Sequence, residues 1–220
     1  MSAPAPPRGV LVALEGPEGA GKSTQLPPLA ARLEAAGRRV TVTREPGGTP
    51  PGERIRGLLL DPEGGPMDGV TEALLFGAAR AALMRRVIAP ALAEGQVVVT
   101  DRFTDSTLAY QGYGRGLPLD ALRAINRLAT DGRAPDLVVL LDLPSAEGLA
   151  RRRRAGGLDR LDGETRAFHE RVAAGYRQLA DADPARWRVV DAAADAEAVA
   201  EALWRVVAAA VGVAAPPPGA

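Results

Sequence analysis

The sequence predicts a single α/β domain, a five-stranded parallel sheet flanked by helices. Between residues 10 and 211, short apolar runs alternate with segments of helical spacing, as in parallel sheets built with right-handed crossovers. The predicted strands at 96–101 and 136–142 contain the uninterrupted apolar runs 97–99 and 137–141, which are typical of strands buried on both faces. No internal repeat or linker divides the chain, so we expect one domain.

The composition is that of an ordinary globular protein and disfavours nucleic-acid binding. Apolar residues make up 46% and charged residues 25% of the 220 positions. Lys and Arg together number 27, as do Asp and Glu, so the net charge is zero, whereas nucleic-acid-binding proteins are usually basic. Because the chain has no cysteine, disulfides, thiolate catalysis and Cys-ligated zinc are excluded.

The two ends are rich in Pro and Ala, and we predict disordered tails at 1–8 and 213–220 around a domain at 9–212. The N-terminal stretch has no apolar core of the kind that signal peptides carry. No apolar run approaches the length needed to span a membrane. We therefore expect a cytoplasmic protein without a membrane partner.

The first predicted strand, 10–15, leads into a glycine-rich turn of the form Gly-x-x-x-x-Gly-Lys-Ser. Its glycines allow several backbone N–H groups to point inward, and the helix that follows adds the positive end of its dipole. Lys22 can reach the outer phosphates of a nucleotide, and the Ser23 hydroxyl can bind magnesium. The plainer alternative is a glycine-rich turn with a surface lysine. The predicted triphosphate-binding residues are Gly16, Pro17, Glu18, Gly19, Ala20, Gly21, Lys22, Ser23 and Thr24.

A helix at 22–36 should follow, ended by Gly37. Pro27 and Pro28 lie inside it and lack the N–H groups of helical hydrogen bonds, so we expect a kink or a tightened first turn. The later elements follow from apolar periodicity. They are strands at 39–43, 96–101, 136–142 and 188–191, and helices at 52–60, 71–93, 118–130, 145–154, 165–182 and 195–211.

Two places in these later elements carry candidate functional groups. Phe76 and Arg80 are four residues apart in a helix and share a face, although a core phenylalanine beside a solvated arginine is the plainer interpretation. Asp101 and Arg102 end a buried strand, at the edge of the sheet where α/β proteins bind ligands. The segment 103–115 that follows is unusually rich in hydrogen-bonding groups for a connector.

The motifs favour a small-molecule kinase over other triphosphate-binding proteins. The chain lacks the Asn-Lys-x-Asp segment with which GTP switches read guanine, and the third strand ends in Asp101-Arg102 instead of the Asp-Glu of many motors. An acid followed by a base suits two tasks, ordering magnesium through water and holding an acceptor phosphate. Arg151–Arg154 could neutralise charge during phosphoryl transfer, although a basic surface run is the plainer alternative.

Five segments in one order carry a family resemblance: Glu15–Thr24, Thr43–Thr49, Leu75–Arg80, Asp101–Gly116 and Leu158–Asp162. Through them the chain resembles bacterial thymidylate kinases over nearly its full length, about residues 9–210. The third and fourth segments are the most specific, because other nucleoside-monophosphate kinases do not share them. The resemblance implies a P-loop nucleoside-monophosphate-kinase fold with a lid at about 151–162. The implied reaction is transfer of a phosphoryl group from ATP to dTMP with magnesium, giving dTDP for dTTP biosynthesis.

The resemblance also assigns roles to individual residues. Phe76 would stack on thymine, Arg80 would bond its carbonyl edge, and Tyr110 would crowd the 2′ position of the sugar. Arg56 and Arg102 would hold the acceptor phosphate. The implied dTMP-binding residues are Glu18, Arg44, Glu45, Arg56, Phe76, Arg80, Arg102, Ser106, Thr107, Tyr110 and Gln111, and the implied magnesium residues are Ser23 and Asp101.

In some members of this family, the glycine-rich phosphate loop carries an arginine where this chain has Gly19. Members that have glycine there take a cation from the lid instead. The lid candidates here are Arg151–Arg154 and Arg160, of which we favour Arg154 and Arg160. His169 is expected on a helix surface near the lid, without a catalytic role. The implied catalytic residues are Lys22, Arg102, Arg154 and Arg160.

Family members are commonly homodimers, and the Ala-rich faces of the helices at 71–93 and 118–130 could pack against a second copy. Leu74, Ala78 and Ala81 give the first of these helices an apolar stripe. Two alternatives to a dTMP kinase stay open. One is a kinase for a related nucleotide such as dUMP, and the other is a non-catalytic ATP-binding protein that keeps the same fold.

Overall fold

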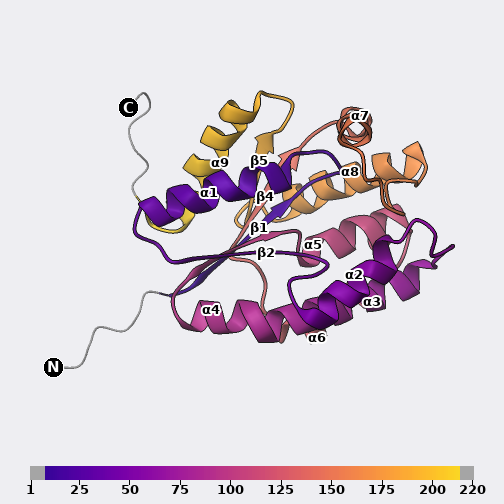
Figure 1. The fold of residues 1–220 in the computed structure, drawn as a ribbon, viewed down its shortest axis with the longest axis horizontal. Helices are drawn as coiled ribbons and strands as arrows, with labels where there is room; N and C mark the ends of the chain where they lie inside the picture. Colours follow the sequence, from indigo (N-terminus) through magenta and orange to yellow (C-terminus); the bar gives the residue numbers. More distant parts are fainter. Residues whose placement is uncertain (1–7, 214–220) are drawn as a thin grey trace.

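The five strands of this computed structural model, which describes residues 8–213, form one parallel sheet with the order β2-β3-β1-β4-β5 (Figure 1). The chain therefore winds to one side of β1 and then to the other, which opens a crevice at the carboxyl ends of the central strands. The strands are β1 Val10–Glu15, β2 Val40–Arg44, β3 Val97–Asp101, β4 Leu137–Asp142 and β5 Trp187–Asp191. The predicted five-stranded α/β architecture is confirmed.

Helices cover both faces of the sheet. In Figure 1, α1 and α9 lie on one face, while α3, α4, α6 and α8 lie on the other. The helical elements are α1 Lys22–Ala35, α2 Pro50–Leu60, α3 Gly69–Leu83, η1 Met84–Ile88, α4 Ala89–Ala93, α5 Thr104–Thr107, η2 Leu108–Gly114, α6 Leu119–Thr130, α7 Ser145–Ala155, α8 Arg166–Ala182 and α9 Ala196–Ala210.

The central strands are buried on both faces, as their apolar runs predict. In β1, Val12 and Leu14 pack with α1 and α9, while Leu11 and Ala13 belong to the core on the opposite side. All four side chains are fully buried. This double burial fixes the strand ends, and with them the residues that enter the crevice.

Two helical segments differ from expectation. Helix α1 is continuous through Pro27 and Pro28, so the prolines do not divide it. The predicted helix at 71–93 is instead α3, a π-helical stretch η1, and α4. Pro90 is the second residue of α4, just after η1, where a missing N–H would interrupt α-helical hydrogen bonding.

The segment 103–115, which we expected only to be rich in hydrogen-bonding groups, folds as α5 and the π-helical η2. Alternating polar and apolar residues gave no clear helical period there. The π turn places several consecutive side chains in the interior, including Tyr110 and Gln111. This arrangement turns the segment into one wall of the crevice.

The predicted tails fall mostly on residues 1–7 and 214–220, which lie outside the described residues. Arg8 is described and pairs with Asp136, and the Val213 N–H donates to the Ala208 carbonyl. Within 8–213, every helix is too short or too polar to cross a membrane.

Candidate active site

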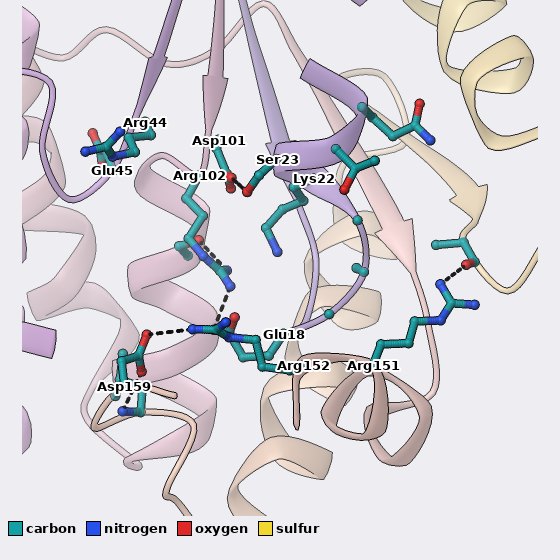
Figure 2. Close-up of a pocket in the computed structure, with 18 of the residues that line it drawn as sticks. Glu18, Lys22, Ser23, Arg44, Glu45, Asp101, Arg102, Arg151, Arg152 and Asp159 are labelled. Atoms are coloured by element: carbon teal, nitrogen blue, oxygen red, sulfur yellow. Dashed lines mark hydrogen bonds and ion pairs between the residues drawn. The ribbon is translucent and has the colours of Figure 1, made fainter. Parts of the chain in front are cut away.

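A cavity of about 760 Å³ opens at the carboxyl ends of β1 and β3, and most predicted site residues line it (Figure 2). Gly16, Pro17, Arg80, Arg154 and Arg160 are predicted site residues that do not line it. Those that do are Glu18, Gly19, Ala20, Gly21, Lys22, Ser23, Thr24, Arg44, Glu45, Arg56, Phe76, Asp101, Arg102, Ser106, Thr107, Tyr110 and Gln111.

Lys22, the only lysine in the sequence, is held inside the phosphate loop. Its Nζ donates to the Gly16 carbonyl at 3.0 Å and to the Pro17 carbonyl at 2.9 Å. Burial, followed by the positive charge of Arg102, lowers the pKa of Lys22 to about 8. An entering phosphate would restore favourable surroundings for the charged amine, so this site is built to receive an anion.

Ser23 and Asp101 meet at the start of α1 and the end of β3. The Ser23 hydroxyl donates to Asp101 Oδ2 at 2.7 Å, although the two residues are 78 positions apart in the chain. Hydroxyl and carboxylate oxygens are the ligands that Mg²⁺ prefers, alongside water and nucleotide phosphates. Ser23 and Asp101 thus bring together two oxygens of the kind that could bind the ion with water and phosphate.

Arg102 adopts a left-handed backbone with φ of 70°, which costs a non-glycine residue about 1–2 kcal/mol. Its guanidinium donates to Glu18 Oε1 at 2.8 Å and to the Tyr110 hydroxyl at 2.9 Å, and its Cζ lies 4.8 Å from the centre of the Tyr110 ring. A strained backbone at a charged residue in a cavity is typical of functional sites. Arg102 is thereby aimed across the cavity toward the phosphate loop.

Glu18 joins the phosphate loop to the opposite wall. Burial alone would raise its pKa, but Arg102, Lys22 and the hydrogen bond from Tyr110 outweigh burial and lower the pKa to about 2. The carboxylate therefore stays ionised throughout the physiological range. Figure 2 shows Glu18 between Arg102 and the arginines of α7.

Phe76 and Arg80 occupy different environments. Phe76 is partly buried and lines the cavity beside Thr107 and Gln111. Arg80 is only 1% exposed, so the alternative of a solvated arginine is wrong. Its five N–H groups bond to carboxylate, hydroxyl, amide and carbonyl oxygens of Glu45, Thr107, Asn126 and Phe103. The hydrogen bond from Arg80 to thymine stays a prediction. It would require Arg80 to give up one of these present partners.

The end of β2 and helix α2 supply further cations, and the loop between them supplies one carboxylate. Arg44 pairs with Glu53 at the cavity edge, at 3.1 Å. Arg56 donates to the Pro46 carbonyl at 2.9 Å and lines the cavity. Glu45 lines the cavity, and its carboxylate pairs with the buried Arg80 behind it at 2.6 Å.

Two arginines of the predicted lid lie at the cavity, but they differ from the two that we favoured. Arg151 and Arg152 enter from α7, on the side opposite Asp101 (Figure 2). Arg151 donates to the Ala192 carbonyl at 2.9 Å, and Arg152 Nε lies 3.0 Å from an Asp162 carboxylate oxygen.

The two favoured arginines lie elsewhere. Arg154 is exposed on α7. Arg160 pairs with the fully buried Glu72 at 2.7 Å and donates to the Leu59 carbonyl at 3.0 Å. Arg160 thus anchors the far end of the lid segment, and a contact with phosphate would require it to leave a buried ion pair.

Helix α7 packs directly on the phosphate loop, glycine against glycine. A Cβ atom on Gly19 would lie 2.0 Å from the Gly148 carbonyl oxygen, and one on Gly148 would lie 2.1 Å from the Glu18 carbonyl oxygen. Any larger residue at either position would push the two backbones apart. The structure therefore gives a physical reason for glycine at position 19.

Sequence reasoning missed two buried residues of the site and misplaced a third. Glu15 accepts hydrogen bonds from Ser106 and from Tyr176, a residue in the middle of α8 that carries no motif. Glu15 begins the phosphate-loop motif, which was the only available signal. His169, expected on a helix surface, is 2% exposed, and burial lowers its pKa.

The cavity joins two kinds of site. One end of the cavity is a cradle for a triphosphate, and the other end contains Arg102 and the aromatic ring of Phe76. Transfer of a phosphoryl group between two nucleotides requires a binding site for each of them. Fold and cavity together define the class of P-loop nucleoside-monophosphate kinases.

Comparison with known proteins narrows this class. A family model described as "Thymidylate kinase" matches residues 14–203. The chain is 55% identical to the thymidylate kinase of Thermomicrobium roseum over 197 residues, which cover 89% of this chain and 93% of that relative. It is 50% identical to that of Deinococcus radiodurans (91% and 97% covered) and 52% identical to that of Solidesulfovibrio magneticus (90% and 98% covered). The chain belongs to the thymidylate kinase family, whose members phosphorylate dTMP to dTDP.

Proposed function

We propose that this chain transfers the γ-phosphoryl group of ATP to dTMP with magnesium, supplying dTDP for dTTP biosynthesis. The observation that carries the proposal is that Lys22 and Ser23 line the same continuous cavity as Phe76 and Gln111. Family membership supports both substrates. Triphosphate in the loop and a thymine ring against Phe76 would bring the two phosphates together between Lys22 and Arg102.

Catalysis would rest on positioning and electrostatics, because the acceptor is already a phosphate anion and needs no general base. Lys22 would release the loop carbonyls and bind outer phosphates of ATP. Arg102 would hold the acceptor phosphate, supported by Arg56. Glu18, ionised and bonded to Tyr110, would face the sugar of dTMP.

Ser23 and Asp101 would hold the magnesium ion, directly or through water, since their oxygens already lie together. When bound, the ion would neutralise charge on the phosphates of ATP. Arg151 and Arg152 lie at the cavity and are the supported lid cations. Each would exchange its present carbonyl or carboxylate partner for phosphate as α7 closes.

An acceptor screen tests the function. The purified protein is incubated with ATP, magnesium and one nucleoside monophosphate at a time, and ADP release is measured. We expect dTMP to be the best acceptor, with dUMP weaker because it lacks the methyl group. If another nucleoside monophosphate is a better acceptor than dTMP, the proposed substrate is wrong. If no acceptor gives ADP, the non-catalytic alternative is supported.

We also propose a single kinase domain at 9–212 that acts as a homodimer in the cytoplasm. Exposed apolar side chains on two adjacent helices support the dimer: Leu74 is 55% exposed on α3, and Leu128 is 78% exposed on α6. Ala78 and Ala124 extend these apolar surfaces. Sedimentation velocity should give the mass of two chains, and a monomer at micromolar concentration would contradict the assignment.

A further inference from the structure

Arg102 is held from both of its ends by one buried carboxylate. The Phe103 N–H, which belongs to the peptide directly after Arg102, donates to Glu15 Oε1 at 2.8 Å. The other oxygen, Glu15 Oε2, accepts from the Ser106 hydroxyl at 2.6 Å and from the Tyr176 hydroxyl at 2.9 Å. These two hydroxyls in turn accept from Arg102 Nη1, at 3.3 Å and 2.9 Å.

The backbone of Arg102 needs such a restraint because its φ of 70° is unfavourable for a residue with a side chain. Its N–H donates to the Leu14 carbonyl at 2.9 Å, and its carbonyl accepts from the Thr100 hydroxyl at 2.9 Å. Glu15 completes the set by fixing the next peptide. Glu15 and Thr100 are both fully buried, so water cannot substitute for either.

We propose that Glu15 is the positioning residue for Arg102, setting its backbone through Oε1 and its guanidinium through the Ser106 and Tyr176 hydroxyls. The proposal rests on the proposed role of Arg102 in holding the acceptor phosphate. Glu15 does not line the cavity, so it acts through Arg102 and does not touch the substrate.

The charge state of Glu15 decides how well its Oε2 holds the Arg102 guanidinium through the Ser106 and Tyr176 hydroxyls. Burial, followed by the nearby Asp105 carboxylate, raises the pKa of Glu15 to about 7, against the opposing effects of the Ser106 hydrogen bond and the Arg102 charge. Above that pH the carboxylate accepts from both hydroxyls, whose lone pairs then face Arg102. Below it, the carboxyl proton competes for the same hydroxyl oxygens. The contribution of Glu15 to kcat/KM for dTMP should therefore rise as the pH increases through about 7.

Glu15→Gln tests the proposal because glutamine has nearly the same shape as glutamate but replaces one carboxylate oxygen with an amide nitrogen. The amide oxygen would keep the hydrogen bonds that Glu15 Oε1 accepts from the Phe103 N–H at 2.8 Å and the Ser106 N–H at 3.2 Å, while the amide nitrogen would face the hydroxyls as a donor. We expect kcat/KM for dTMP to fall about 10- to 100-fold, while KM for ATP changes less than about 3-fold. The ratio of wild-type to variant kcat/KM, measured from pH 6 to 8.5, should rise through about 7. Ionisation of the substrate phosphate cancels in that ratio.

Two further variants complete the test. Tyr176→Phe removes one hydroxyl and should lower kcat/KM for dTMP about 3- to 10-fold. Tyr113→Phe is the matched control, since the Tyr113 hydroxyl makes no hydrogen bond to the described part of the chain, and it should stay within about 2-fold. Thermal unfolding at pH 8 reports folding: Glu15→Gln should be at least as stable as wild type, because a raised carboxyl pKa costs the wild type stability as pH rises through it.

A pH-independent ratio, or equal losses toward ATP and dTMP, would overturn the proposal. If Glu15→Gln fails to fold, Tyr176→Phe decides, with an acceptor-selective loss supporting the proposal and none refuting it. If wild type prefers another monophosphate, the proposed substrate fails. The same variants assayed with that acceptor still test Glu15, because Arg102 is assigned to the phosphate and not to the base.

Discussion

The phosphate loop and the lid present cations to the same cavity in opposite ways. Lys22 is buried in the loop and Arg102 lies beside it, since both donate to the Gly16 carbonyl, and Arg102 also pairs with Glu18. Arg151 and Arg152 lie on α7 at the rim and are occupied by carbonyl and carboxylate oxygens that phosphate would have to displace. Both pairs would exchange hydrogen-bond partners for phosphate, but the first pair is already fixed beside the loop, whereas the second pair depends on where α7 lies when the lid closes.

The largest effect should follow from removing the preorganised amine. Lys22→Ala should lower kcat by on the order of 10²- to 10³-fold, because a fixed cation that faces the transferring group is lost. Circular dichroism should show an unchanged fold, since the side chain bonds only two loop carbonyls. Turnover near the wild-type value would contradict the assigned role and would remove the difference between loop and lid.

A smaller effect is expected where the two regions touch. Gly148→Ala would force its Cβ to within 2.1 Å of the Glu18 carbonyl oxygen, so α7 must move away from the loop. We expect kcat to fall about 10-fold as the lid arginines lose their position. Gly57→Ala is the matched control, because nothing lies within 4 Å of its added Cβ in helix α2. That control should keep full activity and gain up to about 1 kcal/mol of stability.

The comparison becomes sharper inside the lid. Arg152→Ala should lower kcat about 10-fold with little change in KM for dTMP, because Arg152 lies at the cavity. Arg154→Ala should change kcat less than about 2-fold, because Arg154 is exposed and does not line the cavity. Steady-state kinetics with both substrates varied would measure this. The reverse order of effects would restore Arg154 as the lid cation and would imply a rotation of α7 on closure.

The sequence allowed the phosphate loop to be located with accuracy, because a local motif determines both its backbone and its chemistry. The same holds for the Ser23–Asp101 pair, which follows from the parallel sheet that brings strand ends together. The lid was predicted less well. Four consecutive arginines cover every side of a helix, so only the packing of α7 decides that Arg152 and not Arg154 lies at the cavity.

Residues that act from behind the cavity gave the weakest signals. Tyr176 lies in an ordinary amphipathic helix, and its hydroxyl meets Glu15 across 161 positions of sequence. The burial of His169 and the ion pair of Arg160 with Glu72 likewise depend on contacts between distant segments. No periodicity or spacing within a single segment carries information of that kind.

Lys22 is also the only lysine in the sequence, so the phosphate loop contains the only side-chain amine of the chain. With a pKa lowered to about 8, that amine is largely nucleophilic at a pH where ordinary lysines remain protonated. A small acylating reagent would therefore modify one side chain, and the rate of modification would report whether the loop is filled. Nucleotide occupancy could thus be followed by mass spectrometry at a single, chemically unique atom.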